Sequence, residues 1–223
     1  MSNAELKAKV FAAIDANAEQ IIEIGETIWK NPEPGYREFK TAALTAQILK
    51  SLNLPVQEKL GVTGVRADMT FSSEGPTIAI LGEMDSLILP THPECDPETG
   101  AVHSCGHNAS MAGMLGTAIG IAAAGINKEL CGKIAFIAVP AEECIEIEKR
   151  LEMISQGRIA SLGGKGELIR RGVFDDVVLS FMLHSGGGYA YGPHNGFITK
   201  KVTFKGFSCH AAAPGGGINA LHF

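Results

Sequence analysis

The 223-residue sequence lacks several features that mark particular classes of protein. It has no basic block, and 19 Lys and Arg residues against 24 Asp and Glu residues give a formal net charge of -5, so we expect no nucleic-acid partner. Its five cysteines are an odd number without Cys-x-x-Cys spacing, which argues against a disulfide framework and predicts a reducing compartment, the cytoplasm. The N-terminus has no basic stretch followed by an apolar one, so we expect no secretory signal.

Residues 109–127 contain no charged side chain and form a segment that approaches the length of a membrane-spanning helix, about 20 residues. It is rich in Ala and Gly, poor in Leu and aromatic residues, and begins directly after the cluster Cys105-Gly106-His107-Asn108. This composition favours a helix buried in the centre of an α/β protein. We therefore expect no membrane partner.

The hydrophobic pattern predicts helices at the N-terminus and strands after them. Ser2 and Glu5 are spaced as a capping box, and apolar residues at three- and four-residue steps then predict one amphipathic helix through about Trp29. A second helix is expected over residues 39–52. Residues 65–71 alternate between apolar and polar, as in a half-buried strand, and residues 197–204 alternate again.

Three further runs are apolar throughout and are expected to be interior strands: residues 77–81, 133–139 and 177–183. Helical stretches separate them, so the fold class is predicted to be α/β, with a mostly parallel central sheet and flanking helices.

Polar residues that could bind a metal or take part in catalysis follow the ends of these three strands. Glu83 and Asp85 follow the first, Glu142 and Glu143 the second, and His184 the third. Ligands of open α/β sheets bind at this edge, so we expect the side chains to share one crevice. Crowded carboxylates need a counter-charge, and carboxylate, imidazole and thiol groups together suit zinc, or manganese or cobalt.

Each of these residues also has an ordinary explanation when taken alone. A Glu-Glu pair is usually a solvated surface feature, and a His after a strand is more often a hydrogen-bonded structural residue than a ligand. Cys105 alone would most often be a small buried hydrophobic residue. The hypothesis of a metal site depends on the ordered set at the strand ends.

The sequence resembles the aminoacylase and carboxypeptidase type of co-catalytic metallopeptidase, family M20. It is most similar to the amidohydrolase branch of hippurate, indole-acetyl-amino-acid and aminobenzoyl-glutamate hydrolases. The matching stretches occur in family order and cover nearly the whole chain: residues 28–33 with Glu38, 82–85, 103–108, 140–143, 182–185, and 206–214 with Asn219 and Ala220.

The resemblance implies a role for each matching residue. The implied ligands of one or two zinc or manganese ions are Cys105, His107, Glu143 and His184. Glu142 would be the general base, and Asp85 would orient a ligand or bridge two ions. His210, from the lid of a dimer partner, would stabilise the oxyanion, and Asn219 would bind substrate. The implied reaction is hydrolysis of the amide bond of an N-acyl amino acid or dipeptide-like substrate, and we expect the chain to form a homodimer or to self-associate in another way.

The sequence departs from the family pattern at three points. Asn108 stands where many relatives have Asp, and Glu83 stands where other branches have His or Asp. The family's last His ligand and most of its lid have no counterpart before Phe223, and His222 lies at the wrong place to replace that ligand. The resemblance therefore predicts an incomplete phosphorylase/hydrolase-like catalytic domain over residues 1–194 and the beginning of an α+β lid or dimerisation domain over residues 195–223.

Two other functions fit parts of the sequence. A truncated, catalytically impaired or inactive remnant would keep the fold, with or without a metal. A thiol hydrolase would use Cys105 as nucleophile and His107 as base, although neighbours two residues apart on a loop rarely reach that geometry.

Overall fold

The computed structural model describes residues 1–186, 200 and 202–222, which fall into two units, Met1–Gly186 and Gly187–Phe223. The helices of the first unit are α1 (Asn3–Ala16), α2 (Ala18–Trp29), α3 (Phe39–Ser51), α4 (His107–Ala124), α5 (Ile147–Ser155) and α6 (Gly164–Arg170), with a short 3-10 helix η1 (Asn127–Glu129). Its strands are β1 (Val56–Leu60), β2 (Gly64–Thr70), β3 (Ser73–Glu83), β4 (Leu87–Ile88), β5 (Ala101–Val102), β6 (Cys131–Val139) and β7 (Val177–Met182).

A five-stranded sheet in the order β1-β2-β6-β3-β7 forms the centre of the first unit. β3 pairs in parallel with β6 and β7, whereas β2 pairs antiparallel with both β6 and β1. Four of the five strands therefore run in one direction, with β2 reversed between two of them. The α/β fold class is confirmed. The sheet is mixed rather than mostly parallel, because two of its four strand pairs are antiparallel.

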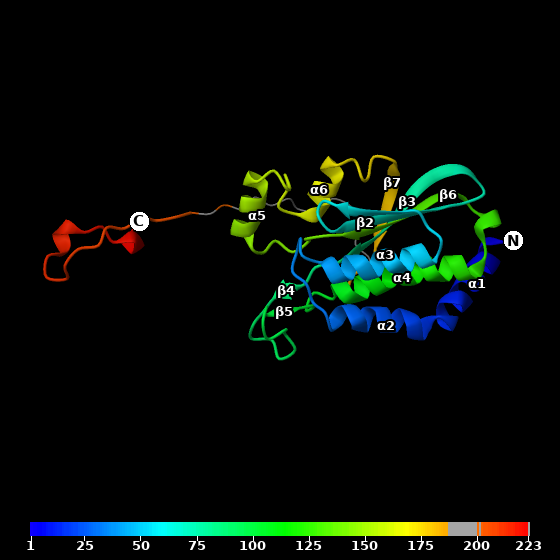
Figure 1. Ribbon diagram of the computed structural model, residues 1–223, viewed down its shortest axis with the longest axis horizontal. Helices are drawn as coiled ribbons and strands as arrows, with labels where there is room; N and C mark the ends of the chain where they lie inside the picture. Colours follow the sequence, from blue (N-terminus) through cyan, green and yellow to red (C-terminus); the bar gives the residue numbers. More distant parts are fainter. Residues whose placement is uncertain (187–199, 201, 223) are drawn as a thin grey trace. The chain divides into compact units, whose positions relative to one another are not determined.

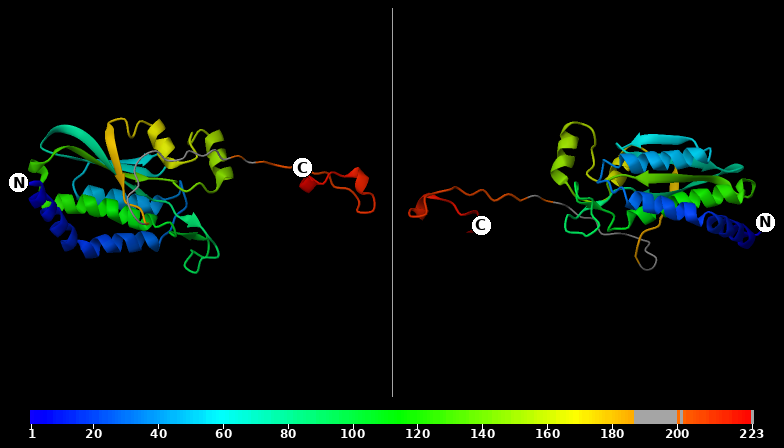
Figure 2. Two further views of the ribbon diagram at one scale, coloured as in Figure 1. Left: turned by 180° about the vertical axis from the view of Figure 1, so that it is seen from behind. Right: turned by 60° about the horizontal axis from the view of Figure 1, so that its bottom comes forward.

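Helices cover both faces of the sheet (Figures 1 and 2). α3 and α4 pack against one face, α1 and α2 pack on the outer side of α4, and α6 lies against the other face. Along β6, Phe136 and Ala138 belong to the core on the α4 side, whereas Ile137 and Val139 belong to the core on the α6 side. Burial on both faces explains why this strand has no polar alternation.

The uncharged run forms the buried helix α4, as predicted. Its glycines allow close packing, because a Cβ atom at Gly116 would lie 2.9 Å from Ile21 and one at Gly120 would lie 2.4 Å from Ile14. Small residues at this interface let α1 and α2 approach the α4 backbone. None of the helices in the described part of the chain is long and apolar enough to cross a membrane.

The prediction of one helix through Trp29 is wrong. The structure has α1 and α2, separated at Asn17. The Asn17 backbone N–H bonds to the carbonyl of Ile14, and its side-chain amide donates to the carbonyl of Ala13 at 2.7 Å. Asparagine side chains that hydrogen-bond to nearby backbone carbonyls compete with regular helix. The helical hydrogen-bond ladder therefore breaks at Asn17, although the apolar periodicity of the sequence continues across the break.

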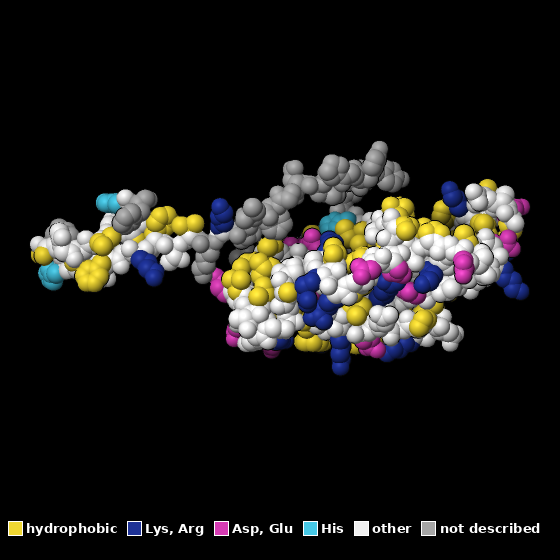
Figure 3. All heavy atoms as spheres, turned by 90° about the horizontal axis from the view of Figure 1, so that it is seen from above, with side chains coloured by type: hydrophobic (Ala, Val, Ile, Leu, Met, Phe, Trp, Pro, Cys, Tyr) yellow, Lys and Arg dark blue, Asp and Glu magenta, His cyan; other side chains and the backbone are white. Residues whose placement is uncertain are grey.

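The expectation that residues 177–183 form an interior strand is also wrong. β7 is an edge strand, and Val178, Phe181 and Leu183 are 69%, 53% and 52% exposed. Hydrophobic side chains reach the surface of the first unit in the view from above (Figure 3). An apolar run does not distinguish a central strand from an edge strand, because only the tertiary pairing decides whether a neighbour covers it.

The second unit contains two short 3-10 helices, η2 (Pro214–Gly216) and η3 (Ala220–His222), and a bridge between Phe207 and Ile218. The predicted alternating element at 197–204 falls partly outside the described residues, and its described part, 200 and 202–204, forms no strand. The predicted domain boundary at 194–195 also lies outside the described residues and stays a prediction.

Candidate metal centre

A tight turn at the start of α4 brings Cys105 and His107 to the end of β7. Gly106 has a φ of 84°, and a Cβ atom there would lie 2.5 Å from the Ser185 hydroxyl oxygen. That hydroxyl donates a hydrogen bond to the carbonyl of Cys105 at 2.7 Å. Only glycine satisfies both the left-handed backbone and this close approach, so the Cys-Gly-His order follows from the turn.

His107 is fully buried and its ring orientation is fixed. Its Nδ1 lies 2.7 Å from the carbonyl oxygen of Asp85, which can only accept, so Nδ1 donates and carries the proton. Nε2 then faces the Glu83 carboxylate, with 3.1 Å between Nε2 and Oε2. This is the orientation of a histidine that offers one nitrogen to a metal while the other is held by the protein.

The Asp85 side chain fixes the backbone of the Glu-Glu pair. Its Oδ1 accepts from the Glu142 backbone N–H at 3.0 Å and its Oδ2 from that of Glu143 at 2.9 Å. Asp85 is completely buried, and both of its carboxylate oxygens are engaged.

The ends of β3, β6 and β7 bring the remaining groups together. The His184 Nε2 lies 3.6 Å from Cys105 Sγ and 3.7 Å from Glu83 Oε2. Glu142 Oε2 and Glu143 Oε1 each lie 3.9 Å from His107 Nε2. In two sets, Cys105–His107–His184 and Glu83–His107–Glu142, all the potential ligand atoms lie within 4.8 Å of one another.

Unpaired buried atoms in this cluster fit a cation. Glu83 Oε2, His107 Nε2 and Glu143 Oε1 are buried and make no hydrogen bond to the residues that the structure describes, although Glu83 Oε2 and His107 Nε2 face each other as an ion pair at 3.1 Å. Buried polar atoms without partners are costly, and one divalent ion between them would satisfy all three. Thiolate and imidazole ligands suit zinc, whereas the carboxylates also suit manganese.

The environment shifts the pKa values of these groups. Burial lowers the pKa of His107, but the carboxylates of Asp85 and Glu83 outweigh it and raise that pKa to about 11. Burial raises the pKa of the Cys105 thiol. Burial and the nearby Glu83 charge raise the pKa of Glu142. Without a metal, the centre therefore keeps protons on His107 and Cys105 that metal binding would release.

Two residues near the centre had no role assigned from the sequence. The ammonium group of Lys165, on α6, contacts Glu83 and lies 3.6 Å from Glu142 Oε1. Glu38 is fully buried and accepts a hydrogen bond from the backbone N–H of Ala141 at 2.7 Å. Lys165 belongs to no motif, and Glu38 lies far from the Glu-Glu pair in sequence, so only the fold places them here.

The remaining predicted site residues, His210 and Asn219, belong to the second unit. His210 Nδ1 accepts from the Ala212 backbone N–H at 3.1 Å, and Asn219 Oδ1 accepts from the Leu221 backbone N–H at 2.9 Å. The two units are not placed relative to one another, so the roles of His210 and Asn219 stay predictions.

Comparison with known proteins identifies relatives with hydrolase names, although no family model matches the chain. Thermostable carboxypeptidase 2 of Saccharolobus solfataricus is 32% identical over 188 residues, which cover 81% of this chain and 42% of the relative. A p-aminobenzoyl-glutamate hydrolase polypeptide of Escherichia coli is 31% identical over 225 residues, which cover 94% of this chain and 42% of the relative. The chain thus spans about two fifths of the length of these relatives.

Solved structures share the fold of the first unit. A putative aminohydrolase from methicillin-resistant Staphylococcus aureus matches with a TM-score of 0.63 and 25% identity, over 78% of this chain and 41% of that one. The YXEP protein of Bacillus subtilis, described as a dinuclear metal binding peptidase, matches with a TM-score of 0.59 and 24% identity, over 74% and 42%. Together with the sequence relatives, these matches show that the chain belongs to the M20 family of peptidases and amidohydrolases.

Proposed function

We propose that the chain carries the water-activating centre of a metal-dependent amidohydrolase that acts on N-acyl amino acids or dipeptide-like amides. The observation that supports this best is the convergence of three buried potential ligand atoms that make no hydrogen bond to the described residues, on Glu83, His107 and Glu143, beside the Glu142 carboxylate. The names of the relatives, which include a carboxypeptidase and an aminobenzoyl-glutamate hydrolase, support an amide substrate.

Cys105, His107, Glu143 and His184 are the proposed ligands. A zinc or manganese ion held by them would polarise the scissile carbonyl group and acidify a water molecule. The burial of Glu143 and the hydrogen bond of its backbone N–H to Asp85 keep its carboxylate directed at the centre. Asp85 thus acts as a positioning residue in this proposal, because it also holds the His107 ring by its carbonyl oxygen.

Glu142 is the proposed general base. Its carboxylate is partly exposed, with 35% of the side-chain surface accessible, so a substrate and a water molecule can reach it. Its raised pKa brings proton transfer closer to neutral pH, which suits a group that takes a proton from the attacking water and returns it to the leaving nitrogen. His210 would donate to the developing negative charge and Asn219 would bind the substrate, as the resemblance implies.

Activity assays with Glu142→Gln test the assignment. Turnover of hippurate or p-aminobenzoyl-glutamate by purified chain supplied with Mn²⁺ or Zn²⁺ is the result that distinguishes catalysis by this chain from an impaired or inactive remnant. The variant should keep its bound metal and lose roughly 10²–10⁴-fold in rate, the usual contribution of a general base. Glu152→Gln, on the exposed surface of α5, is the matched control and should leave the rate unchanged.

Metal content separates this proposal from the inactive remnant. A chain that binds metal without any turnover would contradict catalysis by this chain and support a metal-binding remnant. A chain that binds no metal, and is not stabilised by added zinc or manganese, would contradict the proposal and favour the remnant. Self-association, implied by the resemblance, is supported by the exposed apolar side chains of β7, and the mass in solution by light scattering tests it.

A further inference from the structure

Lys165 places a positive charge inside the proposed metal centre. Its ammonium group contacts Glu83 Oε1 and lies 3.6 Å from Glu142 Oε1, while 38% of its side-chain surface remains accessible. The side chain of Glu83 is 1% exposed, and its carboxylate contacts Lys165 through Oε1 and faces His107 Nε2, 3.1 Å away, through Oε2. Lys165 is therefore a counter-charge to these two carboxylates, together with the His107 ring, whose Nε2 lies 3.1 Å from Glu83 Oε2 and 3.9 Å from Glu142 Oε2.

The backbone fixes Lys165 at this position. α6 begins one residue earlier at Gly164, whose N–H donates to the carbonyl of Ala141 at 3.0 Å. A Cβ atom at Gly164 would lie only 1.6 Å from the carbonyl oxygen of Pro140, so the start of α6 packs directly on the segment that leads to Glu142. A close backbone contact, and not a flexible loop, thus fixes the position of the lysine.

The two potential ligand sets share one nitrogen. Cys105–His107–His184 and Glu83–His107–Glu142 both require His107. Its Nδ1 is bonded to the Asp85 carbonyl, which leaves the single lone pair of Nε2 as the available donor. One lone pair binds one ion, so an ion held by Cys105, His107 and His184 leaves Glu83 and Glu142 without this imidazole. A second ion beside these two carboxylates would lie where the Lys165 ammonium lies.

We propose that the ammonium group of Lys165 takes the place of a second metal ion beside Glu83 and Glu142, so that this chain binds a single ion at Cys105, His107, Glu143 and His184. The inference deepens the proposed function and rests on it. A divalent cation placed within a few ångströms of the ammonium would be repelled, whereas the ammonium itself satisfies the carboxylates. The YXEP protein, described as dinuclear, would differ from this chain in that respect.

Zinc stoichiometry tests the proposal without reference to activity. Wild-type chain and the variants Lys165→Met, Lys165→Gln and Lys165→Arg are dialysed against buffered Zn²⁺, and bound zinc is measured by mass spectrometry against protein concentration. We expect about one zinc ion per chain in the wild type and in Lys165→Arg, and about two in Lys165→Met and Lys165→Gln. The affinity for the second ion should rise at least about tenfold when the charge is removed.

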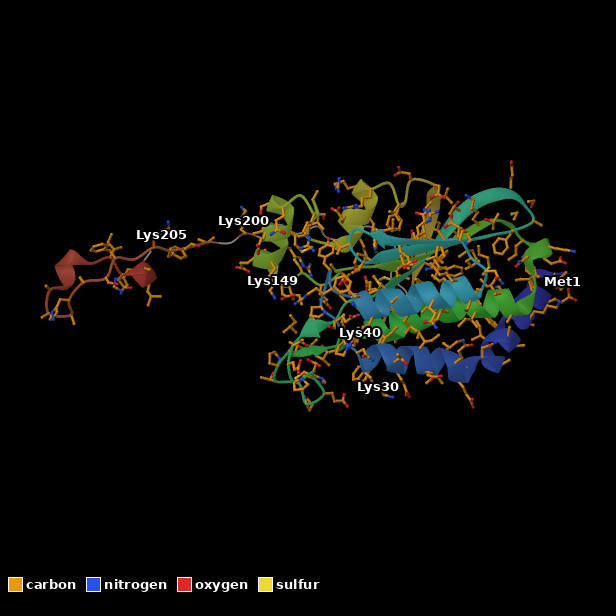
Figure 4. The ribbon with its side chains drawn as sticks, viewed as in Figure 1. Met1, Lys30, Lys40, Lys149, Lys200 and Lys205 are labelled. Atoms are coloured by element: carbon orange, nitrogen blue, oxygen red, sulfur yellow. The ribbon has the colours of Figure 1, made fainter. Side chains whose placement is uncertain are left out.

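Lys149→Met is the matched control. Lys149 is labelled in Figure 4 and lies on α5, so its replacement removes an equal charge from another helix. This variant should still bind about one ion. The absorption of Co²⁺ bound to the Cys105 thiolate gives a second readout, and its intensity per chain should be the same in wild type and Lys165→Met. Circular dichroism establishes which of the two charge-removing variants is folded.

Two ions bound by the wild type would overturn the inference and leave the proposed function intact. So would one ion in folded Lys165→Met and Lys165→Gln. A wild type that binds no zinc and no Co²⁺ would instead contradict the proposed function on which the inference rests.

Discussion

Replacement of Glu38 by Gln is expected to change how the stability of the protein depends on pH. The Glu38 side chain is fully buried, accepts from the Ala141 N–H at 2.7 Å and from the Thr63 hydroxyl at 2.5 Å, and takes part in none of the ion pairs of the described residues. Burial raises its pKa to about 7, against the opposing effect of the Thr63 hydrogen bond.

The sign follows from proton binding. With a pKa near 4.5 in the unfolded chain and about 7 in the folded one, Glu38 binds more protons in the folded state between these values. The free energy of unfolding of the wild type therefore contains a contribution that falls as the pH rises through this window. A difference of about 2.5 pKa units corresponds to about 3 kcal/mol.

The Gln side chain is neutral and nearly the same shape. Its carbonyl oxygen can accept from Ala141, and its amide group can donate to the Thr63 hydroxyl oxygen. We expect Glu38→Gln and wild type to have similar stability near pH 4.5, and the variant to be more stable by about 3 kcal/mol at pH 8. Other titrating groups, such as His107, cancel in the difference between the two proteins.

Urea denaturation at a series of pH values measures that difference. Glu26→Gln serves as the control, because Glu26 is exposed on α2, and its difference from wild type should stay flat with pH. Parallel stability curves for wild type and Glu38→Gln between pH 4.5 and 8 would refute the reasoning, since they would mean that Glu38 ionises as freely in the folded chain as in the unfolded one.

Three further predictions concern the start of α6 and the metal centre. Gly164→Ala should destabilise the chain by more than about 4 kcal/mol in urea denaturation, because its Cβ atom would overlap the Pro140 carbonyl. Gly163→Ala is the control and should be tolerated, because a Cβ atom there meets nothing within 4 Å. Equal effects of the two substitutions would contradict the packing. Cys105→Ser should weaken Zn²⁺ binding at least about tenfold by competition with a chelator, and unchanged zinc binding with lost activity would instead favour a thiol nucleophile. Because the pKa values of His107 and Cys105 are raised, zinc affinity should fall as the pH falls, and calorimetry in buffers of different ionisation enthalpy should detect about two protons released per ion.

Much of the fold could be predicted from the sequence, because hydrophobic periodicity reports local structure directly. The second helix and the strands at residues 77–81 and 133–139 were placed correctly, with α3 ending at Ser51 and β6 ending at Val139. One error is local and the other concerns tertiary context. Periodicity did not reveal the break at Asn17, and an apolar run did not reveal that β7 lies at the edge of the sheet.

The candidate site shows the same division. The residues that follow strand ends, Glu83, Asp85, Glu142, Glu143 and His184, do converge, because parallel strands end at one edge of a sheet. Their hydrogen-bond partners could not be predicted. A motif specifies which atoms are available, but only packing specifies that both oxygens of Asp85 are engaged by backbone N–H groups.

The sequence by itself determined the kind of protein: an α/β chain with a buried Ala- and Gly-rich helix and a set of metal-binding residue types in the order of family M20. The tertiary structure alone decided which charges meet. Lys165 and Glu38 lie 82 and 103 residues from the groups they contact, Glu83 and Ala141. No local pattern encodes such contacts, because they arise only when α6 and the segment before α3 pack against the loop that carries the Glu-Glu pair.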